Sequence, residues 1–268
     1  MTTAASRFEA AIRQAATYSQ ARPLVVGLCG AQGSGKTTLA HATAANLNAT
    51  GLRTVVLALD DLYLPLEARQ SLAAEIHPLL RTRGVPGTHD TELGETLLRA
   101  LAKPEPTALP SFDKATDTRL ARAQWPTHQG PFDIIIFEGW MVGATPQPAQ
   151  ALATPVNDLE RVEDPHATWR TYANDQLAGP YRHLFHHIHC LVLLAAPSFA
   201  TVFAWRQQQE EALHHLKQTK GAPRNAIMDE VALRRFVAHY QRLTEHILQE
   251  MPSRAHLVLR LNSDRSLR

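Results

Sequence analysis

The stretch that decides the fold reads Gly30-Ala31-Gln32-Gly33-Ser34-Gly35-Lys36-Thr37. It fits the pattern G-x-x-x-x-G-K-[ST] of a phosphate-binding loop, whose glycines let backbone N–H groups turn toward an anion. An apolar run precedes the loop at 24–29, and a helix-prone stretch follows it at 38–47. A position between a strand and a helix is the context that this motif needs. The sequence therefore predicts that these eight residues and Thr38 bind a nucleoside triphosphate.

Two side chains of the loop have expected roles. Lys36 is placed to reach the β- and γ-phosphates, and Thr37 to supply a hydroxyl group to Mg²⁺. The N-terminus of the following helix adds partial positive charge. ATP and Mg²⁺ are therefore the expected cofactors.

Length and composition limit the classes of protein to which this chain can belong. The chain has 268 residues, of which 44% are hydrophobic, and its formal net charge is +2. This length suits one large domain over 1–268, and the small charge argues against an extended nucleic-acid surface. No apolar run approaches the ~20 residues of a membrane span, and no secretory segment is recognisable. We therefore expect neither nucleic acid nor membrane as a partner; the sequence indicates no oligomeric state.

The cysteines and the N-terminal segment bear on location. Cys29 and Cys190 adjoin apolar runs, which is typical of buried, reduced thiols in a cytoplasmic protein. Residues 4–16 are rich in alanine and favour a first helix. An organelle transit peptide is the alternative, against which Glu9 argues because such peptides avoid acidic residues.

The remaining pattern predicts the fold class. Five short apolar runs are expected to form strands: 24–29, 54–59, 133–137, 190–195 and 257–261. Helix-forming stretches lie between most of them: 36–47, 92–101, 167–187, 199–216 and 229–250. Apolar runs without polar alternation indicate parallel strands covered on both faces. We predict an α/β fold with a five-stranded parallel sheet and helices on both faces, whose ligands bind at the carboxyl ends of the strands.

Two segments stand outside this alternation. Residues 62–131 contain proline, glycine and charged residues but no convincing strand. A loop-rich insert of this length is usually functional, so we expect it to bind the acceptor substrate. The segment at about 206–226 ends in a polar stretch with glycine and proline and is predicted to form a lid.

Acidic residues follow two of the predicted strands, at the edge where the phosphate loop lies. Asp60 and Asp61 follow the second strand, and Glu138 follows the third. One such carboxylate can accept the proton of an attacking hydroxyl group, and others can hold a metal or its water. We expect Asp60 to act in catalysis, and Thr37, Asp60 and Glu138 to surround Mg²⁺. The alternative is that the adjacent acids cap the next turn.

Cations beside glycine and proline turns suit an anionic acceptor. Two clusters in the insert have this form: Arg81-Thr82-Arg83-Gly84-Val85-Pro86-Gly87-Thr88-His89-Asp90 and Pro110-Ser111-Phe112-Asp113-Lys114. The alternative for both is a solvated loop, in which Asp90 caps the next helix. On the helix after the fourth strand, Arg206 can reach a transferred phosphoryl group, or instead extend along the helix surface.

The order of these motifs resembles that of the D-glycerate 3-kinase family, part of the P-loop kinase group with uridine kinase, phosphoribulokinase and pantothenate kinase. The likeness runs from Leu24 to about Leu261. Its specific parts are Arg83-Gly84 with Gly87-Thr88-His89-Asp90, the run 110–114, and Phe137-Glu138-Gly139-Trp140-Met141-Val142-Gly143. They look like the family's R-G…G-S-H-D, P-R-Y-D-K and F-E-G-W-M-L-G. The run 59–63 looks like its D-D-F-Y, with Leu62 in place of phenylalanine.

The resemblance implies that Asp60 is the catalytic base, Glu138 the metal-side acid and Arg206 the lid arginine. We expect the acceptor site to draw on Asp61, Tyr63, Arg81, Arg83, His89, Asp90, Asp113 and Lys114; for Asp90 the resemblance implies a place near the acceptor. Two positions depart from the family pattern, because Ser111 replaces an arginine and Phe112 a tyrosine. Arg81, Lys114 or Arg119 could then take the place of the missing cation.

The expected activity is transfer of the γ-phosphoryl group of Mg·ATP to a small hydroxy acid, with D-glycerate giving 3-phosphoglycerate. One alternative is a kinase for another hydroxyl acceptor, such as a nucleoside or pantothenate. Another is a regulatory ATPase, against which the long insert argues. A GTPase switch would need the motifs D-x-x-G and N-K-x-D, and neither is found.

Overall fold

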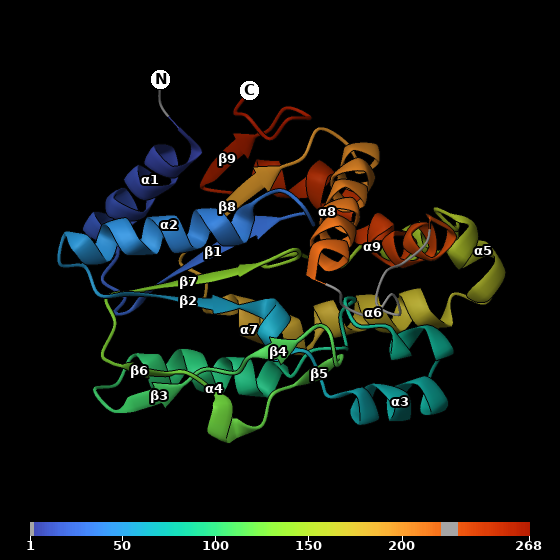
Figure 1. Ribbon diagram of the computed structural model, residues 1–268, viewed down its shortest axis with the longest axis horizontal. Helices are drawn as coiled ribbons and strands as arrows, with labels where there is room; N and C mark the ends of the chain where they lie inside the picture. The colour runs from blue at the N-terminus through green and yellow to red at the C-terminus, as the bar shows by residue number, and fades with distance from the viewer. Residues whose placement is uncertain (1–2, 221–229) are drawn as a thin grey trace.

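Five parallel strands form the central sheet (Figure 1). In chain order they are β1 (Leu24–Gly30), β2 (Thr54–Ala58), β7 (Ile134–Gly139), β8 (Cys190–Ala195) and β9 (Leu257–Arg260). Across the sheet the order is β2-β7-β1-β8-β9, so that β1 lies in the centre. The predicted five-stranded parallel sheet is confirmed. The computed structural model describes residues 3–220 and 230–268, without the side chains of 212–220.

Helices cover both faces of the sheet. One face carries α1 (Ala4–Tyr18), α2 (Lys36–Ala49) and α8 (Phe199–Lys220), and the other carries α4 (Thr91–Leu101), α6 (Thr168–Ala178), α7 (Pro180–His186) and α9 (Glu230–Glu250). Successive residues of β1 point to opposite faces: Leu24, Val26 and Leu28 pack in one core, and Val25 and Cys29 in the other. Because both faces are buried, the strand must be apolar throughout, which explains its unbroken run.

The predicted single helix over 167–187 is wrong, because the chain forms α6 and α7 there. Gly179 and Pro180 separate the two helices. Proline has no N–H group with which to continue the hydrogen bonding of α6, but it fits the first turn of α7, where that group has no intrahelical partner.

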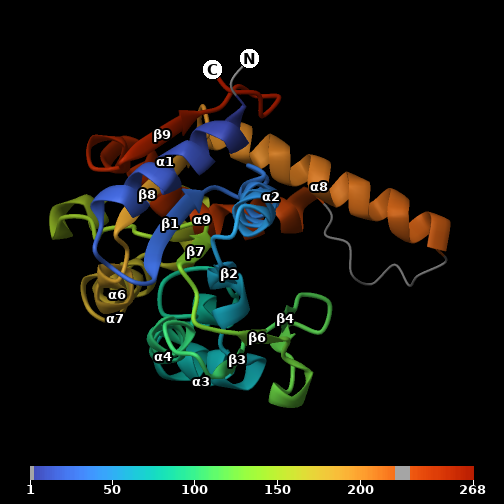
Figure 2. The same ribbon diagram turned by 90° about the vertical axis from the view of Figure 1, so that its left-hand side faces the viewer.

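The insert at 62–131 is folded, and the expectation that it lacks strands is wrong. It follows the 3-10 helix η1 (Leu59–Leu62) and contains α3 (Leu66–Glu75), η2 (Pro78–Arg81), α4 and η3 (Arg122–Gln124). Two small antiparallel sheets complete it: β3 (Pro106–Ala108) with β6 (Thr127–Gln129), and β4 (Phe112–Asp113) with β5 (Thr118–Arg119). Strands of two or three residues are too short to show a periodic pattern. Figures 1 and 2 both show α3, α4 and these strands gathered below β2.

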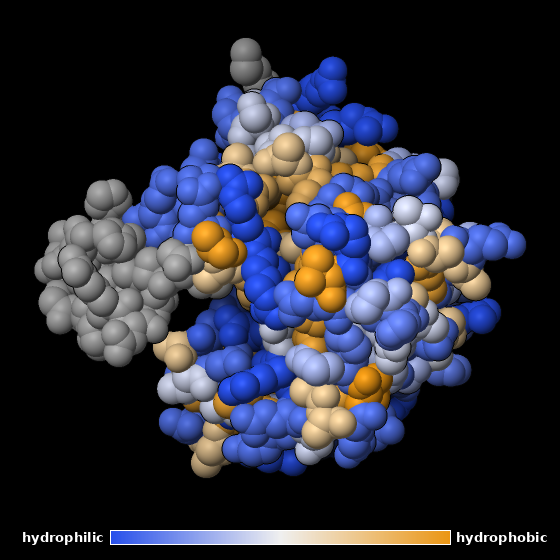
Figure 3. All heavy atoms as spheres, turned by 90° about the vertical axis from the view of Figure 1, so that its right-hand side faces the viewer, coloured by the Kyte–Doolittle hydropathy of each residue, from blue (hydrophilic) through white to orange (hydrophobic). Residues whose placement is uncertain are grey.

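The other short elements are η4 (Ala149–Leu152), α5 (Asp158–Glu163) and η6 (Met251–Ser253). Of the predicted lid, residues 206–220 continue α8, whose end projects from the body in Figure 2; 221–226 lie outside the described residues. No helix in the described part of the chain is both long enough and apolar enough to cross a membrane. The face drawn in Figure 3 is mostly hydrophilic, with its hydrophobic side chains in separate groups.

Candidate active site

The phosphate loop joins β1 to α2. Gly33 and Gly35 have φ values of +76° and +85°, a region that residues with a side chain rarely adopt. A Cβ atom on Gly33 would lie 2.7 Å from the Cβ of Trp205, so glycine also lets α8 pack against the loop. Ser34 N–H donates to the carbonyl of Ala31 at 3.2 Å, which closes the turn. The loop thereby presents the N-terminus of α2 as an anion site.

Thr37 and Glu138 meet across the ends of α2 and β7. Thr37 Oγ1 donates a hydrogen bond of 2.7 Å to Glu138 Oε1, and Glu138 is only 3% exposed. A hydroxyl and a carboxylate are oxygen ligands of the kind that Mg²⁺ takes in phosphoryl-transfer enzymes. The donor set therefore fits the expected metal. Thr38, the next residue of α2, is exposed.

An open pocket of about 720 Å³, counting the part that opens to solvent, connects this loop with the insert. Lys36 and Thr37 line it from the donor side, and Arg83 and Lys114 line it from the insert. Asp60 lies between them. The pocket thus joins residues that are up to 208 positions apart in the sequence, from Gln32 to Tyr240.

Asp60 is held by a lysine and a tyrosine. Lys114 Nζ lies 2.7 Å from its Oδ2 atom, and the hydroxyl of Tyr63 donates to Oδ1 at 3.1 Å. Burial raises the pKa of Asp60, but the charges of Lys114 and Lys36 and the Lys114 hydrogen bond outweigh it and lower the pKa to about 2. Asp60 is therefore a carboxylate at neutral pH.

The adjacent acid has different surroundings. Asp61 Oδ1 accepts the backbone N–H of Phe112 at 2.9 Å and so fastens β4 to η1. Burial raises the pKa of Asp61. The pKa values of the two acids shift in opposite directions because Lys114 and Lys36 lower that of Asp60, whereas burial dominates for Asp61.

His89 and Asp90 lie behind the pocket rather than in its lining. The buried ring of His89 stacks on Tyr63 at 4.3 Å between centroids, and its Nδ1 lies 2.6 Å from the hydroxyl of Tyr181. Burial lowers the pKa of His89 to about 3, so the ring is neutral. Asp90 caps α4 through the N–H of Leu93 at 3.0 Å, and its other oxygen lies 3.2 Å from Arg119. Direct contact of either residue with an acceptor stays a prediction.

Of the other residues expected to bind the acceptor, some line the pocket and others do not. Arg83 lines the pocket and places its guanidinium 5.6 Å from the centroid of the Phe112 ring. Arg81 is exposed at the end of η2 and does not line the pocket. Asp113 accepts the Thr116 hydroxyl at 2.8 Å within the turn after β4, also outside the lining.

Arg206 reaches the pocket from α8 but is engaged there. It forms an ion pair with Glu210, one helical turn on, and its guanidinium lies 5.7 Å from the centroid of the Phe236 ring. Its side chain is 18% exposed. Contact of Arg206 with a transferred phosphoryl group stays a prediction.

Sequence reasoning misses two residues that organise the insert. Arg69 in α3 is wholly buried and donates to the carbonyls of Leu64 at 3.1 Å and Arg81 at 2.6 Å. It also pairs with Asp117, in the turn between β4 and β5, at 2.9 Å. A lone arginine on a helix and an aspartate in a turn are ordinary surface features in a sequence, so neither carries a usable signal.

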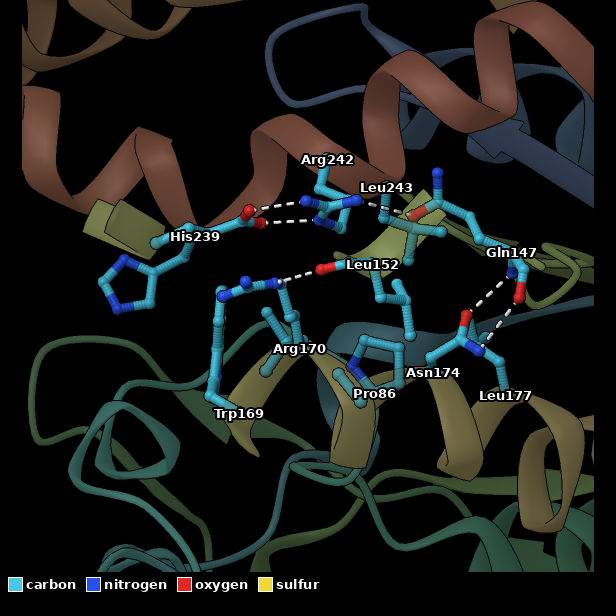
Figure 4. A pocket seen from close by; sticks show the side chains of 13 residues that line it. Pro86, Gln147, Leu152, Trp169, Arg170, Asn174, Leu177, His239, Arg242 and Leu243 are labelled. Atoms are coloured by element: carbon cyan, nitrogen blue, oxygen red, sulfur yellow. Dashed lines mark hydrogen bonds and ion pairs between the residues drawn. The ribbon is translucent and has the colours of Figure 1, made fainter. Parts of the chain in front are cut away.

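A second pocket, of about 370 Å³ including the part that opens to solvent, lies beside Pro86 of the loop at 81–90 (Figure 4). Gln147 and Asn174 face one another there, with the N–H of Gln147 donating to Asn174 Oδ1 at 2.7 Å. Its arginines are also paired: Arg242 lies 2.6 Å from Glu160, and Arg170 donates to the carbonyl of Leu152 at 2.7 Å. The pocket that contains Asp60 differs in being lined by Lys36 and Thr37 of the phosphate loop, so it is the candidate site of phosphoryl transfer.

Comparisons with known proteins indicate a kinase. The Zeta toxin family model matches residues 9–64, which include the phosphate loop. An uncharacterized kinase of Schizosaccharomyces pombe, mug58, is 32% identical over 249 residues, 89% of this chain and 86% of the relative. The chloroplastic D-glycerate 3-kinase of Arabidopsis thaliana is 30% identical over 241 residues, 86% of this chain, which spans half of that enzyme.

Among solved structures, the D-glycerate 3-kinase of Cryptococcus neoformans superposes with a TM-score of 0.78 at 26% identity. The match covers 98% of this chain and 97% of that one, so the insert is matched along with the sheet. Together with the phosphate loop and the acids beside it, these relatives show that the chain belongs to the P-loop kinase group that includes D-glycerate 3-kinase and uridine kinase, and that it is a glycerate 3-kinase-like phosphotransferase.

Proposed function

We propose that this kinase transfers the γ-phosphoryl group of Mg·ATP to the terminal hydroxyl group of D-glycerate, giving 3-phosphoglycerate and ADP. The observation that carries the proposal is the shared pocket of Asp60, Lys114 and Arg83 beside the phosphate loop. A carboxylate next to two cations suits an acceptor that carries both a hydroxyl and a carboxylate group. The relatives named as D-glycerate 3-kinases support the choice of acceptor.

On the donor side, the backbone N–H groups of 30–37 and the ammonium group of Lys36 bind the phosphates of ATP. Thr37, Asp60 and Glu138 would hold Mg²⁺, which when bound offsets the negative charge of the phosphates. The Thr37–Glu138 hydrogen bond supports this assignment because it already brings two of the three oxygen donors together.

On the acceptor side, the carboxylate of D-glycerate pairs with Lys114 and Arg83, and its terminal hydroxyl group faces Asp60. The hydroxyl oxygen attacks the γ-phosphorus in line, the bond from phosphorus to the ADP oxygen breaks, and the hydroxyl proton passes to Asp60. Because the pKa of Asp60 is about 2, the proton moves late, once the forming bond has made the hydroxyl acidic. Asp60 thus acts first by orienting the hydroxyl group.

Lys36 and Arg206 stabilise the charge on the transferred group. In this proposal 1–268 is one kinase domain, 62–131 binds the acceptor, and 206–226 closes over it as a lid. Arg206, which already lines the pocket, turns toward the transferred group when its pair with Glu210 opens.

The test is ATP consumption with and without acceptor, over a panel of D-glycerate, other hydroxy acids, nucleosides and pantothenate, with the product position read by NMR. We expect turnover only with D-glycerate and phosphate on its terminal oxygen. Turnover with a nucleoside or pantothenate instead would overturn the choice of acceptor. Full-rate hydrolysis without any acceptor would favour a regulatory ATPase.

A further inference from the structure

The turn between β4 and β5 contains an aspartate that contacts two arginines. One carboxylate oxygen of Asp117 pairs with Arg83, and the other lies 2.9 Å from a guanidinium nitrogen of Arg69. The φ value of Asp117 is +56°, a left-handed conformation that aspartate and asparagine tolerate better than most residues with a side chain. The backbone therefore bends in an uncommon way where the carboxylate meets both cations.

Arg69 holds Asp117 in place through both its carboxylate and its backbone carbonyl. It is wholly buried, and besides the carboxylate it donates to the carbonyl of Asp117 at 2.8 Å. Its remaining donors reach the carbonyls of Leu64, just before α3, and of Arg81, at the end of η2. One side chain thus ties three separate segments of the insert together, and a rigid, planar guanidinium suits such a task better than lysine does.

Both acceptor-side cations depend on this turn. Arg83 has Asp117 on one side and the ring of Phe112 at 5.6 Å on the other, which leaves its guanidinium facing the pocket. Lys114 lies in the same β4–β5 turn, and its ammonium group lies 2.7 Å from Asp60. Moving the turn would therefore displace both cations relative to the base.

We propose that Asp117, held by Arg69, is the positioning residue of the acceptor site: it orients Arg83 and sets the turn that presents Lys114 to Asp60. Asp117 does not itself line the pocket, so it acts through these two cations. The proposal rests on the proposed function only in taking Arg83 and Lys114 as the groups that bind the acceptor.

The decisive variant is Asp117→Asn, which keeps the size of the side chain and its tolerance of positive φ but removes the charge. With the acceptor that the wild-type protein uses, we expect KM for the acceptor to rise about tenfold, as for loss of a charge-assisted hydrogen bond. KM for ATP should stay within about twofold, since the phosphate loop makes none of these contacts. Arg69 is wholly buried, so its variants serve only as a secondary test.

Two further variants separate positioning from general damage. If Asp117 acts through Arg83 and Lys114, its substitution has a smaller effect once Arg83 is gone: the double variant Asp117→Asn with Arg83→Met raises KM for the acceptor by less than the product of the two single fold-changes. The matched control is Asp158→Asn, which breaks an exposed pair with Arg161 at 2.9 Å far along the chain and should change no constant.

A wild-type KM for the acceptor in Asp117→Asn, while Arg83→Met raises it, overturns the positioning role and leaves the proposed function intact. Additive effects of the two substitutions also overturn action through Arg83. An unchanged KM in Arg83→Met instead contradicts the proposed acceptor site itself. If the acceptor panel identifies a molecule other than D-glycerate, the same comparison of variants with that molecule tests the positioning role of Asp117.

Discussion

Lys114 Nζ lies 2.7 Å from Asp60 Oδ2, so the proposed base is paired with an acceptor-side cation before an acceptor arrives. The lysine side chain is 61% exposed and can move, whereas Asp60 lies at the start of η1 and is held by Tyr63. An acceptor carboxylate would compete with Asp60 for this ammonium group. Binding of the acceptor would then weaken the pair that keeps the pKa of Asp60 low, so the base strengthens as its substrate enters.

The pH profile tests this coupling. Asp60 must be ionised to act, so activity should fall as the pH falls through its pKa of about 2. Removing the lysine charge by Lys114→Met raises that pKa, because burial then acts with less opposition. The acid limb of kcat/KM should therefore move to higher pH. Steady-state kinetics of both proteins, extended from pH 8 down toward pH 2, measure it.

Lys103→Met is the control, since Lys103 is exposed and lies outside the pocket. An acid limb that stays in place in Lys114→Met would contradict the role of the pair. KM for the acceptor should rise in Lys114→Met as well, and this second readout is independent of pH.

A second prediction concerns the hydrogen bond of 2.7 Å between Thr37 and Glu138. Glu138→Gln keeps the shape of the side chain but removes the charge expected to face Mg²⁺. We expect kcat to fall by about 10²- to 10³-fold, a range typical of losing one electrostatic contact to the transition state. The concentration of Mg²⁺ needed for half-maximal activity should rise. Thr37→Ser, which keeps the hydroxyl group, should retain most activity, and an unaltered Mg²⁺ requirement in Glu138→Gln would exclude the metal role.

A third prediction concerns the hydrogen bonds that Tyr181 makes to the loop at 81–90. The hydroxyl of Tyr181 accepts the N–H of Gly87 at 3.0 Å and contacts His89 Nδ1 at 2.6 Å. Tyr181→Phe leaves both buried groups without this partner, which should lower the free energy of unfolding by about 1–3 kcal/mol. Urea unfolding measures it, with the exposed Tyr18→Phe as control.

Because His89 has a pKa of about 3, it is neutral throughout the range pH 5 to 8. The stability lost in Tyr181→Phe should therefore be the same across that range. A loss that grows as the pH falls from 8 to 5 would show that His89 ionises there, contrary to its burial.

The parts of the site that can be predicted from sequence are local in the chain. The phosphate loop is contiguous, and Asp60 and Glu138 each follow an apolar run that marks a strand. The contacts that hold the insert are not local: Arg69 and Asp117 are 48 positions apart. A pattern read along the chain cannot pair such residues, because the fold of the insert depends on short strands that leave no periodic trace.

The roles of the adjacent residues Asp60 and Asp61 could not be told apart from the sequence for the same reason. Asp60 and Asp61 are equivalent in the sequence, yet the turn of η1 sends one toward Lys114 and the other toward the backbone of Phe112. The break between α6 and α7 differs, since the pair Gly179-Pro180 gives a visible signal for it.

The last prediction concerns the pair of Arg206 and Glu210 on α8. Arg206→Met should lower kcat, because the transferred group loses a cation. Glu210→Gln should have the opposite tendency: the arginine no longer has to leave a carboxylate, so the single-turnover rate of phosphoryl transfer should equal or exceed that of the wild type. Glu230→Gln, which breaks the same i,i+4 pairing with Arg234 on the exposed face of α9, is the matched control and should leave the rate unchanged. A slower rate in Glu210→Gln would mean that the paired conformation of Arg206 is the active one.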